Sequence, residues 1–306
     1  MNSQNTLSTK LDVYQIVTDR IIELLEKGTV PWQQPWAAAG IPMNLLSKRP
    51  YRGINFWLLT SLNFDRNLFL TWDQVKKLGG SVKPGEHGHI VVFWKKKQSE
   101  ITEERENKKD VPLLRYYKVF NISQCRDMPE GAVETSTTND LDPILECDAI
   151  IASMPQAPII KHKENEAFYH AEQDFINMPK MKSFKAKELY YSTLFHELVH
   201  STGHEKRLNR PSIIEMAEFG SEKYSIEELI AELGASYLCS LSGILDTSIQ
   251  NSSAYINGWL SKIKNDKRLI VQAAGRAQRA VDFIINQPAS ISGSKEEVQQ
   301  SELHAD

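Results

Sequence analysis

The sequence predicts an α+β protein of two domains, and three features point to this class. Apolar residues recur at helical spacing in some segments and alternate as strands do in others, with turn-forming residues between them. Residues 1–126 hold 19 lysines and arginines against 12 acidic residues, a formal charge of +7, whereas the remainder holds 17 against 27, a formal charge of −10. Five of the six tryptophans fall in the basic part.

These features place the domain boundary near residue 126. Residues 127–143 are rich in acidic, hydroxyl, proline and glycine residues, which is the composition of a surface linker. We expect a basic α+β domain over residues 1–126 and a mainly helical domain with a small sheet over residues 144–287. The small, polar residues 288–306 are expected to form a disordered tail.

Composition narrows the class of protein further. No run approaches the roughly 18 uninterrupted apolar residues of a membrane span, and the amino terminus lacks the apolar segment of a secretory signal. We therefore expect a cytoplasmic protein with no membrane partner. The cysteines Cys125, Cys147 and Cys239 show no CxxC spacing, so they indicate neither a disulfide framework nor a thiolate zinc site.

The first predicted element is an amphipathic helix from about residue 13 to Lys27, which Gly28 ends. The prolines that follow fix φ and exclude regular helix or central strand, so Trp32 and Trp36 stand on a stiff loop. Such rings can stack on bases, or they can fold back onto the helix as core. The sequence leaves both alternatives open.

Cations, an aromatic ring and an amide then gather in the turn-rich residues 47–55. This cluster can grip a backbone phosphate and stack a base. Residues 90–94 and 113–122 read as sheet strands, and the lysines after the first are typical of either a solvated strand exit or a phosphate contact. Sheet faces that mix aromatic rings with cations commonly bind single strands. The predicted DNA contacts are Trp32, Trp36, Arg49, Tyr51, Arg52, Asn55 and Trp94.

The acidic part contains the motif HExxH at residues 196–200, within an apolar helical run. Residues four apart are neighbours on a helix, so His196 and His200 can ligate one Zn²⁺ while Glu197 acts as general base toward the attacking water. The alternative is a solvated helix with incidental histidines. Residues 167–176 precede this helix and alternate as a hairpin does, and an edge strand beside a catalytic helix can pair with an extended peptide.

A catalytic zinc needs a third protein ligand. His204 is a weak candidate, because its spacing from His200 is two residues shorter than the longer zincin motif HExxHxxGxxH requires. The helix predicted over residues 226–238 offers Glu228 as a ligand and Glu232 as an acid that orients an imidazole. Alternatively, Glu227 and Glu228 form a solvated helix start. Glu227 fits that role best, since the helix dipole stabilises a carboxylate in the first turn.

The segments HELVHSTGHEKRLNR, from His196, and EELIAELGASYL, from Glu227, resemble the zincin domain of ArdC-type antirestriction proteins. Residues 29–36, 49–55, 85–94 and 117–121 resemble the single-stranded-DNA-binding domain of the same family. The resemblance implies a protein that enters a recipient cell with transferred plasmid or phage DNA, binds it and protects it from host restriction. The spacing of Glu228 and Glu232 is similar to that of thermolysin, although the distance from His200 is longer.

The sequence therefore predicts an antirestriction protein that binds single-stranded DNA and carries a zinc-dependent metallopeptidase site. A host protein or peptide is the expected substrate of that site. One alternative is a purely DNA-binding protein whose zinc is structural or vestigial. A metal-dependent nuclease is a weaker alternative, because HExxH is peptidase chemistry and the sequence offers no carboxylate-rich two-metal cluster.

Overall fold

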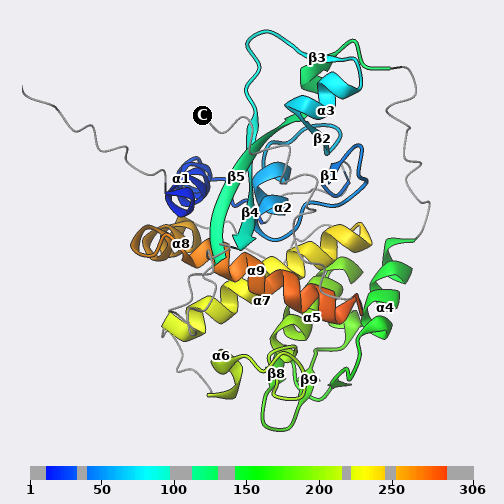
Figure 1. The fold of residues 1–306 in the computed structure, drawn as a ribbon. Helices are drawn as coiled ribbons and strands as arrows, with labels where there is room; N and C mark the ends of the chain where they lie inside the picture. The colour runs from blue at the N-terminus through cyan, green and yellow to red at the C-terminus, as the bar shows by residue number, and fades with distance from the viewer. Residues whose placement is uncertain are drawn as a thin grey trace, which may run out of the picture.

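The computed structural model describes residues 12–32, 40–96, 112–129, 142–215, 222–244 and 253–287. Trp36, the predicted linker between residues 130 and 141, and the predicted tail 288–306 lie outside these ranges. The predicted α+β architecture of two domains is confirmed. A sheet with α2 lies on one side of helices α7 and α9, and the strands β8 and β9 lie on the other (Figure 1).

The amino-terminal domain is built on a four-stranded sheet in the order β1-β2-β5-β4. Its strands are β1 (Met43–Asn44), β2 (Leu68–Thr71), β4 (His89–Lys96) and β5 (Pro112–Asn121). The long antiparallel pair β4 and β5 places Val91 opposite Tyr117, and β1 pairs with β2 in parallel. A second, two-stranded sheet joins β3 (Ser81–Val82) to β6 (Cys125–Arg126).

Three helices complete this domain: α1 (Val13–Glu26), α2 (Ile54–Thr60) and α3 (Trp72–Lys77). Helix α1 begins where the Asp12 side chain accepts hydrogen bonds from two backbone amides, and it ends before Gly28 at φ +75°. The predicted helix is therefore confirmed. Its apolar stripe, which includes Val17 and Ile21, is buried.

The carboxy-terminal domain is mainly helical. Its helices are α4 (Pro143–Ser153), α5 (Lys187–Ser201), α6 (Pro211–Ile214), α7 (Glu222–Ser242), α8 (Ser253–Asn265) and α9 (Leu269–Ile284). A three-stranded sheet in the order β7-β9-β8 lies before α5, with strands β7 (Ile159–Lys161), β8 (Phe168–His170) and β9 (Phe175–Asn177). Because β8 is an edge strand, one side of it has no paired strand among the described residues.

Helices α5 and α7 approach closely, and Gly234 makes this possible. A Cβ atom at residue 234 would lie 2.7 Å from Cγ2 of Val199, which is closer than side-chain packing allows. Both Val199 and Leu233 are fully buried at this contact. The glycine therefore sets how near the acidic face of α7 comes to the histidines of α5.

The two domains share one apolar core. Its buried side chains come from both sides of the predicted boundary, for example Trp57 and Leu194. Polar contacts also cross between the domains. Arg52 pairs with Asp282 of α9, and the backbone amide of Gly53 donates to Gln278 at 2.9 Å. The two compositional regions are thus firmly packed against each other.

The hydropathy of the helices was also compared with that of membrane-crossing segments. Within the described ranges, none of the helices combines the length and the apolar character that a membrane crossing requires.

Candidate metal centre and nucleic-acid residues

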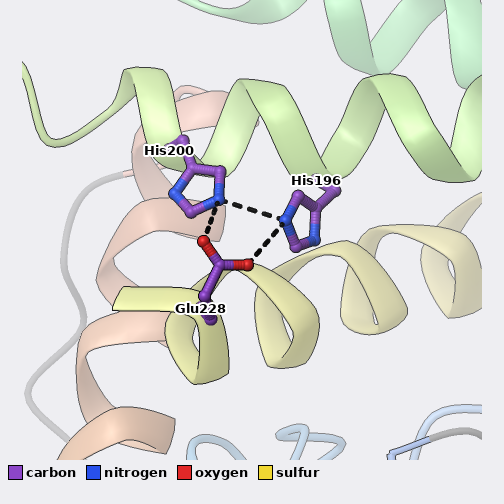
Figure 2. Close-up of side chains that lie close together, drawn as sticks. All are labelled: His196, His200 and Glu228. Carbon is purple, nitrogen blue, oxygen red and sulfur yellow. Dashed lines mark hydrogen bonds and ion pairs between the residues drawn. The ribbon is translucent and has the colours of Figure 1, made fainter. Parts of the chain in front are cut away.

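Helix α5 presents His196 and His200 toward α7, where Glu228 faces both rings (Figure 2). The two Nε2 atoms lie 3.0 Å apart. Nε2 of His196 lies 3.5 Å from one Glu228 carboxylate oxygen, and Nε2 of His200 lies 3.5 Å from the other. The structure therefore brings together the three residues that the sequence predicts as metal ligands.

These residues fit a divalent ion by chemistry and by spacing. Two imidazoles and one carboxylate form the His₂Glu donor set of catalytic zinc sites, and manganese also accepts such ligands. Ligands about 2.1 Å from a tetrahedral zinc lie roughly 3.4 Å from one another. The observed separations of 3.0 and 3.5 Å match that arrangement. Among the described residues, this is the one cluster of histidine, cysteine and acidic side chains that suits a metal.

Glu227 holds His200 from behind. Its carboxylate lies 3.3 Å from Nδ1 of His200, so an N–H donated there leaves the Nε2 lone pair facing Glu228. The same carboxylate accepts from two nitrogens of Arg210, at 2.5 and 3.0 Å, and from the hydroxyl of Ser212 at 2.5 Å. Glu227 is 3% exposed, and its burial is compensated by these partners.

The electrostatics of this network follow from its partners. Burial alone would raise the pKa of Glu227, but the hydrogen bonds from His200 and Arg210 outweigh it and lower that pKa to about 2. Burial opposes, and the Glu228 carboxylate reverses, the shift at His196, so the pKa of His196 is raised. A proton therefore competes for the His196 ring in the absence of an ion.

The prediction for Glu227 as a solvated first-turn acid was wrong. Helix α7 begins at Glu222, five residues earlier, so Glu227 lies in the second turn and faces the protein interior. Glu232, predicted to orient an imidazole, instead accepts hydrogen bonds from the Tyr255 hydroxyl and, at 3.1 Å, from Nε1 of Trp32. The orienting contact that we expected from Glu232 is made by Glu227.

Glu197 opens onto a cleft of about 630 Å³ that also contains both histidines and Glu228. Strand β8 forms one wall of this cleft through Phe168, Tyr169 and His170. Tyr224 lines it from α7, and its hydroxyl is hydrogen-bonded to Glu228. A carboxylate, a phenol and an unpaired strand edge therefore surround the predicted metal ligands.

Four of the predicted DNA-contact residues are engaged in packing. Trp32 is fully buried, and its ring packs edge-on against Trp259. Tyr51 is 7% exposed and packs against Phe69. Arg52 pairs with Asp282, and the Asn55 amide bonds both backbone groups of Val92 at 2.7 Å. These positions argue against the predicted stacking and phosphate contacts for these side chains.

The remaining predicted contacts have different surroundings. Arg49 is exposed on the turn before α2, and Trp94 is 43% exposed on β4, where it meets Tyr14 edge-on. Trp72 was not among the predicted contacts, yet it is also 43% exposed and stands at the start of α3 beside Lys76. Its position directly after an alternating strand, at a helix start, is the signal that could have suggested exposure.

Comparison with protein families supports the division of the chain. Residues 11–120 match the N-terminal domain of anti-restriction factor ArdC. Residues 146–276 match a zincin-like metallopeptidase family. A zincin-like domain implies a divalent metal ion, which agrees with the donor set at His196, His200 and Glu228.

Solved structures include two similar ones, both crystal structures of the antirestriction protein ArdC from plasmid R388. The metal-free form has a TM-score of 0.73 and 38% sequence identity, covering 90% of this chain and 97% of that chain. The Mn(II)-bound form has a TM-score of 0.71 and 36% identity, covering 92% and 100%. The likeness therefore extends over both domains.

Curated relatives include y4eC of Sinorhizobium fredii, an uncharacterised protein that is 28% identical over 93% of this chain and 95% of its own length. The DNA primase TraC of Escherichia coli is 30% identical over 90% of this chain. This chain spans only 27% of that primase.

Proposed function

The chain belongs to the ArdC family of antirestriction proteins, and from that premise we propose that it binds single-stranded DNA and cleaves peptide bonds at a zinc site. Its role is to protect transferred plasmid or phage DNA from restriction in the cytoplasm of the recipient cell. The observation that carries the peptidase part is the meeting of His196, His200 and Glu228 beside Glu197, in a cleft walled by an edge strand.

Zinc is the ion we propose for the site, held by His196, His200 and Glu228. When bound there, it supplies a Lewis acid that polarises the carbonyl of the scissile peptide. Glu227 keeps the His200 ring in the ligating orientation through Nδ1. Manganese, which a similar protein binds, is the competing ion, since imidazole and carboxylate ligands suit both.

Proton transfer falls to Glu197. Its carboxylate takes a proton from the water that attacks the peptide carbon, and it returns that proton to the departing amine nitrogen as the C–N bond breaks. An extended substrate pairs with the free edge of β8, whose side chains line the cleft. The Tyr224 hydroxyl, already directed at Glu228, is available to donate to the carbonyl oxygen as charge develops on it.

DNA binding is proposed for the exposed residues of the amino-terminal domain. Trp94 offers a ring for a base, and Arg49 offers a charge for a phosphate. Titration of the intact protein with single-stranded and double-stranded oligonucleotides of equal length, at two salt concentrations, tests this part. We expect a preference for single strands that weakens with salt. Equal weakness toward both would leave a zinc peptidase without DNA binding.

The variant Glu197→Gln tests the peptidase part. We expect it to abolish hydrolysis of a peptide library while its zinc content and melting temperature match those of the wild type, because Glu197 is not one of the three ligands. Loss of zinc from this variant would contradict the role of Glu197 as base.

A structural role for the metal is the second candidate function. It is favoured by the contact between Trp32 and Glu232, because a metal on α7 one turn away would stiffen the helix to which the amino-terminal domain attaches. Plasmid transfer into restricting and non-restricting recipients separates the two. Full protection by Glu197→Gln would favour a structural metal, and lost protection would favour catalysis.

A further inference from the structure

A hollow of about 640 Å³ lies on the carboxy-terminal domain, away from the metal cleft. Its lining includes Arg276 and Arg279 of α9, Leu208 and Asn209 of the loop after α5, and Ile226 of α7. We name these five residues the arginine hollow. Its lining contains no carboxylate among the described residues, although the part of the chain around it carries a formal charge of −10.

The buried Arg210 also borders the hollow but adds no free charge to it. Its guanidinium donates to Glu227, to the Thr202 hydroxyl and to the carbonyl of Val199. These contacts use its donors on the metal-site network. The positive charge of the hollow therefore comes from Arg276 and Arg279.

Arg276 and Arg279 are three residues apart on α9, so their side chains leave the helix on one face. Arg276 is half-buried and Arg279 is exposed. Neither forms an ion pair or hydrogen bond within the described ranges. The nearby Asp282 cannot neutralise Arg279, because its Oδ1 is held by Arg52 and by Gln278. Two guanidinium groups without acidic partners are suited to bind an anion.

The hollow adjoins the amino-terminal domain. Gln278, the neighbour of Arg279, accepts from the backbone of Gly53, and Asp282 pairs with Arg52. Both partners belong to the turn-rich segment that also carries the exposed Arg49. A strand that contacts Arg49 thus has a positively charged surface of the other domain within the same neighbourhood of α9.

We propose that the arginine hollow binds backbone phosphates of the same single strand that the amino-terminal domain holds. Guanidinium groups bind phosphate oxygens in pairs, and the free amide of Asn209 can donate to a neighbouring oxygen. Leu208 and Ile226 supply apolar surface for a sugar or a base. This inference rests on the proposed DNA binding, and it gives the zincin-like domain a direct share in that binding.

The double variant Arg276→Ala/Arg279→Ala tests the proposal in the full-length protein. The matched control is Lys182→Ala/Lys185→Ala, which removes the same charge near the opposite end of the 15-residue helix α5, about 22 Å away. Fluorescence anisotropy is measured with oligothymidylates of about 10 and about 30 nucleotides, since one binding platform covers roughly 4–16 nucleotides. A salt series is recorded for each protein.

We expect the arginine variant to bind the long strand roughly tenfold more weakly at low salt, with little change for the short strand. Its plot of log affinity against log salt concentration should be less steep by about 1.4, because each phosphate contact on a single strand contributes about 0.7. The control variant should match the wild type in slope, and both variants should keep the wild-type melting temperature.

An unchanged slope and affinity in the arginine variant, with a wild type that binds DNA, would overturn the proposal alone. A wild type that binds neither oligonucleotide would overturn the proposed DNA binding and this inference together. A variant that keeps its DNA affinity but loses binding of a fluorescent phosphoserine peptide would identify the hollow as a peptide site, which also contradicts the proposal.

Discussion

The zincin-like domain gathers its polar side chains around one point, whereas the amino-terminal domain uses comparable side chains to attach itself to its neighbour. Around the metal ligands, Glu227, His200 and Arg210 form one connected network. In the amino-terminal domain, Trp32 reaches Glu232 and Arg52 reaches Asp282. The metal site is therefore organised from within its domain, and the amino-terminal domain depends on contacts outside its own.

This difference matters for reading the two halves as separate modules. Trp32, from the basic half, inserts beside α7 only one turn beyond Glu228, where it meets Glu232 and packs on Trp259. A change in the amino-terminal domain can thus alter the packing behind the metal site. The variants below separate what belongs to each domain from what they share.

The largest expected effect is the loss of the metal. We expect His200→Ala to reduce bound zinc from about one ion per chain to nearly none, because a site with one imidazole lacks the donors that zinc requires. Elemental analysis of the purified protein measures this. His204→Ala is the matched control: His204 is also buried and lies four residues on, yet its Nδ1 accepts from the backbone of Lys206. Equal metal loss in both variants would contradict the three-ligand site.

The second prediction addresses the shared packing. We expect Trp32→Ala to lower the free energy of unfolding by about 3–5 kcal/mol, because it empties a fully buried indole site. Trp32→Phe should lower it less, since it keeps much of the ring but removes the N–H bonded to Glu232 and Tyr255. Urea unfolding of both variants measures the difference. A neutral Trp32→Ala would mean that the domains do not depend on this contact.

Residues of the metal site could be predicted from the sequence because their relation is local. His196 and His200 lie on one helix face at a fixed spacing, and Glu228 lies on a second helix with an apolar face that must be buried. Glu227 could not be assigned in this way. Its partners Arg210 and Ser212 belong to a loop, and no periodicity in the sequence predicts how that loop returns to α7.

Exposure in the amino-terminal domain was harder to predict for a related reason. Proline at position 31 makes the loop stiff, but it does not determine which side of the loop faces the protein. Trp32 and Tyr51 are buried, while Trp94 is partly exposed, although all three lie in segments of similar composition. Tertiary packing across the domain boundary decides this, and a local pattern of aromatic and cationic residues does not record it.

The third prediction compares two acids of α7. We expect Glu227→Gln to weaken zinc affinity about 10-fold to 100-fold, because the His200 ring loses its charged partner at Nδ1. Glu232→Gln, the matched control, should change zinc affinity much less, because its partners are Tyr255 and Trp32. Competition with a fluorescent chelator measures both affinities. The reverse order would restore Glu232 as the orienting acid.

Glu227→Gln also has a pH signature. The pKa of Glu227 is about 2 in the folded protein, below its ordinary value of 4.5. Its stabilising contribution is therefore fully present above pH 4.5 and is lost as the pH falls toward 2. The shift corresponds to roughly 3 kcal/mol for this buried group. Urea midpoints at neutral pH and at about pH 3 should converge between variant and wild type; a constant gap would contradict the assigned ion pair.

The smallest expected effect concerns the two half-exposed tryptophans of the amino-terminal domain. Trp94 and Trp72 are equally exposed at 43%, but they stand on different elements, β4 and the start of α3. We expect Trp94→Ala to weaken single-stranded DNA binding by about 1–3 kcal/mol, the usual contribution of one stacked base. Neither ring is buried, so both alanine variants should unfold at nearly the wild-type urea concentration. Anisotropy titrations at one fixed salt concentration distinguish the two. If Trp72→Ala carries the loss and Trp94→Ala does not, the DNA path runs over α3, away from α9, and the domain junction takes no part in binding.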